Sequence, residues 1–161
     1  MALDASLTSA DLPRMQGRMA RWARDVEDLT PFWRDVMAPL YLGDIQANFD
    51  QQGALVGGWA PLNPGYAKWK AERWGSHLGI LELSLALRGS LQWLGSKHGG
   101  DIGPAGLMQL SPTSMTVGTS LPYAKQQHAI RPILFPPSGP AYGEAWRGWI
   151  MGRWAATDGA V

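Results

Sequence analysis

The segment that most constrains the fold is the run 57–70, which joins a helix-forming half of the chain to a half with strand patterns. Two prolines, an Asn-Pro step and three glycines disfavour any regular element over residues 57–65. The run is nevertheless rich in large apolar side chains, whereas surface loops are usually polar. We therefore predict that this run forms a rigid plug that folds down on the hydrophobic core. One further plug residue is expected to come from a later turn of the chain. The predicted plug residues are Trp59, Leu62, Tyr66, Trp69 and Tyr123.

Two helical stripes precede this run. Residues 11–29 place apolar side chains at steps of three and four, with arginines elsewhere on the wheel, which is typical of an amphipathic helix. A Thr-Pro step predicts a second helix with Thr30 as its cap, running to about residue 50. Pro39 and Gly43 predict a kink or a break within it. The two helices are expected to form a hairpin or an elbow.

The pattern after the run is mixed. A short helix is expected over residues 66–74, ended by glycine. Ser84 is expected to cap a helix to about Leu94, although the leucines there also alternate as in a strand. The runs 106–110 and 114–119 flank a Ser-Pro-Thr turn and predict a hairpin. A further turn and a short helix are expected to follow.

The tail is rich in proline and tryptophan. A stiff spacer over residues 136–140 precedes a helix whose tryptophans share one face. Each interior glycine costs about 1 kcal/mol relative to alanine, so this helix is expected to need a docking surface. We predict that the arm 136–161 meets a partner; the alternative is that its tryptophans fold back on their own core. The candidate interface residues are Trp146, Trp149, Trp154, Arg131 and Phe135.

The composition favours one domain that works through protein contacts. The length of 161 residues fits a single domain, 1–161, with a ragged start over residues 1–10. Only 17% of residues are charged and nine are tryptophan, which favours contact with other proteins. The net charge of +1 gives no whole-molecule basis for binding nucleic acid. Four arginines can be interpreted as a phosphate-binding stripe, but a solvated face is favoured: Arg14, Arg18, Arg21 and Arg24.

No catalytic, metal or cofactor site is expected. The histidines His77, His98 and His128 lack the spacing of a zinc site, and cysteine is absent. No serine sits in a nucleophile elbow, and nothing in the spacing requires Glu82 and Asp101 to pair as in a glycosidase. No membrane span or signal pattern is found, so we expect a soluble protein made in the cytoplasm.

These patterns together predict an α+β fold. Long N-terminal helices would pack with a small antiparallel sheet, the aromatic Gly/Pro loop would plug the core, and an extended arm and helix would end the chain. The region 11–135 forms the body of this domain.

An ordered set of motifs adds a family resemblance. The motifs are Phe49, Gly58-Trp59-Ala60-Pro61-Leu62, Tyr66-Ala67-x-x-Lys70, Ile80-Leu81-x-x-Ser84-x-x-Leu87-x-x-Ser90-Leu91, Val117-Gly118-Thr119, Pro122-Tyr123-Ala124 and Arg131-Pro132-Ile133-Leu134. Their order and spacing resemble the phage virion morphogenesis (tail completion) family of Mu-like phages. Leu85 departs from the pattern, because the family usually has glycine there. Gln127-His128 inverts the family's His-Gln, and Ala129-Ile130 shortens the step that follows.

The resemblance implies a non-enzymatic structural protein of the virion neck or tail end, made in the host bacterium. Such a protein finishes the tail or joins it to the head, as a homo-hexameric ring beside tail-tube, terminator and head-connector proteins and close to the DNA channel. Two alternatives stay open. One is an assembly factor absent from the finished particle. The other is a carbohydrate-binding tail module that stacks sugars on Trp59, Trp69 and Trp74.

Overall fold

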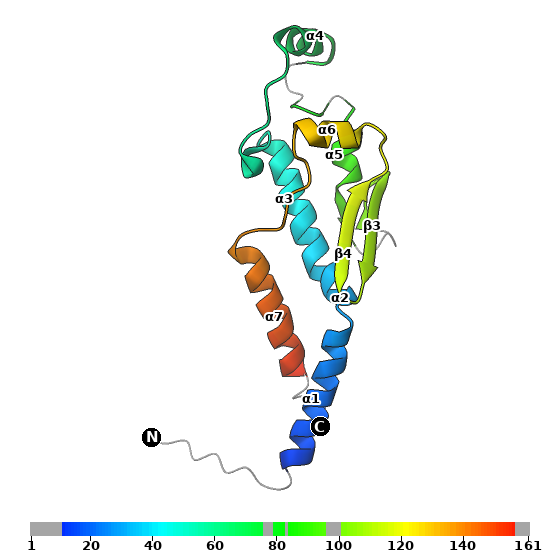
Figure 1. The fold of residues 1–161 in the computed structure, drawn as a ribbon, viewed down its shortest axis with the longest axis vertical. Coiled ribbons are helices and arrows are strands. Elements are labelled where there is room, and N and C mark those ends of the chain that lie inside the picture. The colour runs from blue at the N-terminus through cyan, green and yellow to red at the C-terminus, as the bar shows by residue number, and fades with distance from the viewer. Residues whose placement is uncertain (1–10, 76–78, 83, 96–100, 157–161) are drawn as a thin grey trace, which may run out of the picture.

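The computed structural model describes residues 11–75, 79–82, 84–95 and 101–156 of an elongated molecule (Figure 1). The predicted ragged start 1–10, together with His77 and His98, lies outside these residues. The fold is α+β, as predicted: α1, α3 and α7 run roughly along the long axis, and short antiparallel strands lie beside α3 (Figure 1).

The N-terminal half is a nearly continuous helical column. It consists of α1 (Asp11–Glu27), α2 (Thr30–Phe32), the π-helical turn η1 (Trp33–Met37) and α3 (Ala38–Asp50). Figure 1 shows α1 extending away from α3 instead of folding back on it, so the joint is an elbow and the hairpin alternative is wrong. The predicted Thr30 cap is also wrong. The side chain that meets the start of this helix is that of Asp28, whose carboxylate accepts the Thr30 N–H at 2.9 Å. Asp28 can reach this N–H because it lies two residues before Thr30 in the chain.

Pro39 produces a widened turn and no break. Proline has no N–H to donate to the carbonyl four residues earlier. The preceding Ala38 N–H instead donates to the Trp33 carbonyl, five residues back, and this is the π-helical pattern. The helix then continues through Gly43 to Asp50, so the predicted break does not occur. The single π-helical turn is enough to accommodate the hydrogen bond that Pro39 cannot make.

The glycine-rich connection leads to a helix at the far end of the molecule. Gly53 and Gly57 take positive φ on either side of a 3₁₀ turn, η2 (Ala54–Val56). The Asn63 carboxamide then accepts the Gly65 N–H at 2.9 Å and begins α4 (Pro64–Trp74). Gly75, with φ of 90°, ends it, as the glycine signal predicted.

The rest of the chain combines short helices with two strand pairs and ends in a long helix, α7. The elements are α5 (Ala86–Ser90), β1 (Trp93–Gly95), β2 (Asp101–Ile102), β3 (Gly106–Ser111), β4 (Ser114–Thr119), α6 (Ala124–Ile130) and α7 (Pro140–Ala156). The predicted hairpin is confirmed: β3 and β4 pair from Gly106 opposite Thr119 to Ser111 opposite Ser114. The helix predicted to reach Leu94 ends at Ser90, because the next residues pair with β2.

The core forms where α3 meets the C-terminal half. Leu42, Ile45 and Phe49 of α3 are fully buried against residues from several later segments of the chain. Their buried partners are Trp59, Leu87, Leu91, Ala124 and Ile133. Figure 1 shows α3 between the β3–β4 hairpin and the upper part of α7, which makes it the central element.

Candidate functional site

Trp59 is the plug residue that reaches the core. It is 7% exposed, and its ring meets Phe49 edge-on with centroids 5.2 Å apart. Its indole N–H donates to the Pro132 carbonyl at 2.8 Å. Because the polar edge of the indole has a partner, the whole side chain can be buried at little cost.

The other predicted plug residues do not fill the core. Tyr66, Trp69 and Tyr123 are 42%, 45% and 39% exposed, and Leu62 is half-buried. The cause is the backbone after Trp59, which extends away from the core before α4 begins (Figure 1). The plug prediction is therefore wrong for these aromatic residues, since α4 carries the first two of them to the end of the molecule.

Arg131 fastens the loop to the segment after α6. Its guanidinium donates from Nε to the Ala60 carbonyl at 3.0 Å and from Nη2 to the Pro61 carbonyl at 3.3 Å. His128 Nδ1 accepts the N–H groups of Ile133 and Leu134 at 3.0 and 3.4 Å. Arg131, predicted at an interface, therefore has an internal role, and His128 acts as a backbone acceptor.

Phe135 also contacts its own chain. The side chain is half-buried, and its ring lies 6.2 Å from that of Tyr41, whose hydroxyl donates to the Phe135 carbonyl at 2.9 Å. This bond fixes the start of the proline-rich spacer against α3. The residue serves as an anchor of the C-terminal arm in the described chain.

The tail tryptophans fold back on the N-terminal helices. The ring centroids of Trp146 and Trp149 lie 4.7 and 5.3 Å from the ring centroid of Phe32, a residue that is 2% exposed. Trp154 meets Trp22 edge-on at 6.1 Å, and the Arg18 guanidinium lies 4.7 Å from its ring centroid. In the described chain, these tryptophans thus fold back on their own fold, as the alternative prediction has it. Contact with a partner stays a prediction, because Trp146 and Trp154 keep 37% of their surface exposed.

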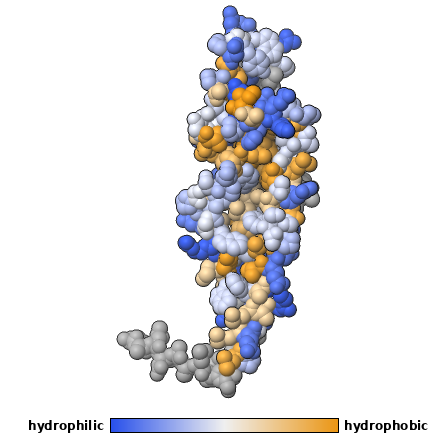
Figure 2. Space-filling model, in the orientation of Figure 1, coloured by the Kyte–Doolittle hydropathy of each residue, from blue (hydrophilic) through white to orange (hydrophobic). Residues whose placement is uncertain are grey.

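We call the pair α1 and α7 the stalk. The apolar stripe predicted on α1 is only partly covered, since Leu12, Met15 and Met19 are 44–58% exposed and Met151 of α7 is 58% exposed. Figure 2 shows hydrophobic and strongly hydrophilic side chains side by side at this end of the molecule. The hydrophilic ones include six arginines: Arg14, Arg18, Arg21, Arg24, Arg147 and Arg153. The same two helices carry four carboxylates, Asp11, Asp25, Glu27 and Glu144, so the six arginines leave a net charge of +2 (6 − 4). The stalk therefore offers an apolar surface with mixed charges and a small positive excess.

A network of charged side chains joins α3, α4 and the segment before α5. Arg88 donates to Glu82 at 2.6 Å and to Asp50 at 2.5 Å. The second carboxylate oxygen of Glu82 accepts the Gly79 N–H at 2.8 Å. Lys70, only 4% exposed, donates to the Gly79 carbonyl, and its burial lowers the pKa of its ammonium group while Glu82 acts in the opposite direction. Glu82 is thus held by Arg88; the side chain of Asp101, its suggested catalytic partner, lies outside the described structure.

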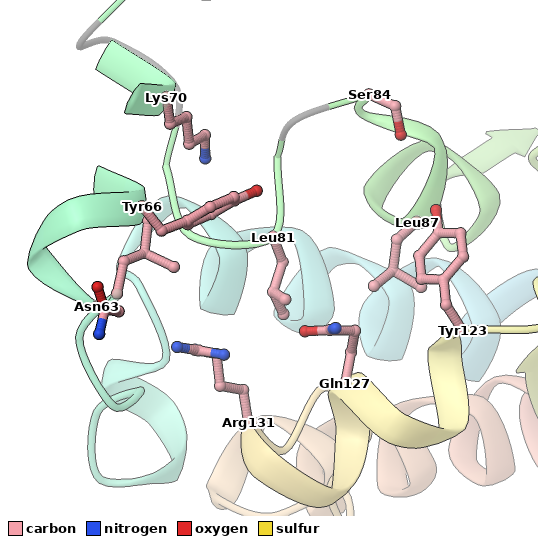
Figure 3. Close-up of a pocket in the computed structure, with 10 residues that line it drawn as sticks. Asn63, Tyr66, Lys70, Leu81, Ser84, Leu87, Tyr123, Gln127 and Arg131 are labelled. Carbon is pink, nitrogen blue, oxygen red and sulfur yellow. The ribbon is translucent and has the colours of Figure 1, made fainter. Parts of the chain in front are cut away.

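A groove of about 480 Å³ opens between α4 and α6 (Figure 3). We call it the α4–α6 groove. Lys70 and Arg131 supply its cations, and Tyr66 and Tyr123 supply its aromatic rings. Its apolar lining consists of the leucines Leu62, Leu81 and Leu87. Two of the exposed plug residues, Tyr66 and Tyr123, thus line one cavity. Sequence periodicity cannot reveal this cavity, because its lining comes from separate elements.

The described residues bring together no group of three metal-ligating side chains. None of the helices described is long and apolar enough to cross a membrane. Comparison of the chain with protein-family models, curated proteins and solved structures found no match.

Proposed function

We propose that this chain is a structural protein of a tailed-phage virion that completes the tail or joins it to the head at the neck. The observation that carries the proposal is that the residues of the family-like motifs bond to one another across the fold. Arg131 and Pro132, from the last motif, bind the backbone of Ala60 and Pro61 and the indole of Trp59, from the motif 58–62. These two motifs therefore form one structural joint, which supports interpreting them together.

A departure from the family pattern supports the same proposal. Leu85 stands where the family usually has glycine, and its φ of 55° lies in the left-handed region that favours glycine. The backbone of this chain thus has the conformation that the family's glycine would suit.

The stalk supplies the surface for assembly in this proposal. Exposed apolar side chains rimmed by polar groups are typical of protein contact sites. A closed ring requires a heterologous contact, in which the stalk meets a different surface of the next copy. Within a homo-oligomeric ring, the surface that the stalk contacts belongs to the next copy of the chain. Where the ring meets another part of the virion, that surface belongs to a tail or neck protein.

The carbohydrate-binding alternative loses one of its three stacking residues. Trp59 is buried, and its ring cannot meet a sugar. Trp69 and Trp74 are exposed on α4, but Trp69 already stacks on Tyr66 with centroids 5.5 Å apart. The assembly-factor alternative differs from the proposal only in the composition of the finished particle, so the experiment has to examine virions.

The test combines deletion of the gene with mass spectrometry of purified particles and native mass spectrometry of the protein. We expect the chain in mature virions, unjoined heads and tails or unfinished tails without it, and a closed oligomer alone or with tail components. Met151→Lys should reduce assembly with little loss of stability. The matched control is Leu107→Lys, since Leu107 is 53% exposed on β3, outside the stalk. Infectious particles in the deletion strain would overturn the proposal, and absence from virions would identify an assembly factor.

A further inference from the structure

The α4–α6 groove contains a buried cation that forms no ion pair among the described residues. Lys70 is 4% exposed, and the acceptor that the structure gives its Nζ is a neutral carbonyl, that of Gly79. Glu82 favours the charged form of Lys70, but its two carboxylate oxygens are bonded to Arg88 and to the Gly79 N–H. A buried ammonium with one neutral acceptor is costly and retains donor capacity, so an anionic group is what would complement it.

The rest of the lining does not supply that group. The groove is lined by two cations and by no carboxylate. Figure 3 shows the Lys70 Nζ directed inward past the Tyr66 ring, with Arg131 at the opposite side. Arg131 uses Nε and Nη2 to hold the loop, and among the described residues its Nη1 has no acceptor. The charge of the lining is therefore complementary to an anion.

The apolar and polar parts of the lining define the remainder of the ligand. Leu62, Leu81 and Leu87 form a surface that fits an aliphatic side chain. Asn63 and Gln127 add carboxamides, which both donate and accept and so match the N–H and C=O groups of an extended backbone. Two cations in a small cavity do not match the repeating phosphates of a nucleic acid, which need a continuous basic surface.

We propose that the α4–α6 groove binds an extended acidic peptide segment of a partner protein, with a carboxylate at Lys70 and an aliphatic side chain on the leucines. The groove lies at the end of the molecule opposite the stalk, so this contact is separate from the stalk contact (Figure 1). It does not depend on the chain's being a virion protein. An extended segment bound in this way would let the protein hold two partners at once.

The experiment measures binding of capped, fluorescent pentapeptides to the full chain by fluorescence polarisation. The probes are Gly-Leu-Asp-Leu-Gly, Gly-Leu-Asn-Leu-Gly and Gly-Leu-Lys-Leu-Gly, each with the same fluorophore on its N-terminal amine and an amidated C-terminus, so that the central side chain carries the only variable charge. We expect the Asp peptide to bind at least tenfold more tightly than the other two. Lys70→Met should abolish this preference, since methionine keeps the apolar stem and removes the charge.

Lys125→Met is the matched control, because Lys125 is an exposed lysine on α6 that does not line the groove. It should leave all three affinities unchanged, and circular dichroism should show that both variants are folded. Equal affinities for the three peptides, no saturable binding of any, or an Asp preference that survives Lys70→Met would each overturn the proposal. Competition by free acetate at the same concentration as the Asp peptide would assign the site to a small anion instead.

Discussion

Leu85 has its backbone in the left-handed region, with φ of 55°, and its side chain is 49% exposed. For a residue with a Cβ, this conformation costs about 1–2 kcal/mol relative to the right-handed helical region. Little apolar burial offsets that cost, because half of the side chain faces solvent. Local strain and weak packing therefore coincide at the start of α5.

We expect Leu85→Gly to raise the free energy of unfolding by about 0.5–1 kcal/mol, because glycine adopts this conformation without the Cβ penalty. Urea unfolding followed by tryptophan fluorescence measures the change. The control is Leu55→Gly, at a leucine that is 48% exposed and lacks a positive φ. That variant should lose stability; a loss in Leu85→Gly as well would mean that packing outweighs strain.

Trp59 shows how much one buried side chain contributes. We expect Trp59→Phe to lower the free energy of unfolding by about 2–4 kcal/mol, from a lost hydrogen bond to Pro132 and a cavity beside Phe49. Trp69→Phe is the matched change on an exposed ring and should cost less than about 0.5 kcal/mol. Similar costs for the two variants in urea unfolding would contradict the burial of Trp59.

The helices differ in what stabilises them. The column from α2 to α3 is fixed by burial, whereas α7 has no buried residue and carries three interior glycines, Gly143, Gly148 and Gly152. Its position depends on the tryptophans that lie on Phe32 and Trp22. The arm is therefore a helix docked on its own chain, and its glycines predict that it needs this docking to form.

We expect Gly148→Ala to stabilise the isolated subunit by about 1 kcal/mol, because alanine is the better helix former and its Cβ would meet nothing within 4 Å. Thermal unfolding with circular dichroism measures this change. Gly53→Ala is the contrasting control: its φ is +86° and its Cβ would lie 2.3 Å from Trp59 Cδ1, so it should destabilise the protein. If Gly148→Ala gains stability but loses assembly, the glycine face of α7 lies at a contact between copies of the chain. If the variant gains no stability, the helical conformation of α7 at Gly148 is contradicted.

At the scale of the whole molecule, the protein is a rod with different chemistry at its two ends. The stalk at one end is apolar and rich in arginine, and the α4–α6 groove at the other is lined by aromatic rings and cations (Figures 1 and 2). The core around α3 connects them. Tyr142 links α7 to this core through its hydroxyl, which donates to the Asp44 carboxylate of α3 at 2.5 Å.

This link predicts how stability depends on pH. Burial, and then the Asp44 carboxylate, raise the pKa of Tyr142 well above its ordinary value of 10.0. In alkaline solution, the unfolded chain loses this proton first, so unfolding releases a proton and stability falls as the pH rises above about 10. Below pH 10, the contribution of the bond is fully present.

We expect the stability difference between the wild type and Tyr142→Phe to be constant from pH 7 to 9 and to shrink from pH 10 to 11.5. Urea midpoints across this range measure it. Tyr123→Phe is the control, because Tyr123 is 39% exposed, and its difference from the wild type should not follow the same course. A Tyr142→Phe difference independent of pH would mean that the Asp44 bond is absent in solution.

The sequence by itself determined the local elements. Apolar spacing predicted α1, α3 and α7, turn chemistry predicted the β3–β4 hairpin, and glycine predicted the end of α4. These signals are readable because they act between residues a few positions apart. The π-helical turn at Pro39 has a local cause too, but the sequence does not say whether a helix will break or widen at a proline.

Only the tertiary structure decided which side chains are buried and which gather at a site. Trp59 and Trp69 lie in the same aromatic run, yet one is buried and the other is exposed, because the backbone between them leaves the core. The strand β1 replaced part of a predicted helix because its partner β2 lies several residues further on. The joint of Arg131 with Ala60 and the lining of the α4–α6 groove span about 60 residues or more of chain. Such contacts depend on how distant segments meet, and burial is a property of that meeting and not of local spacing.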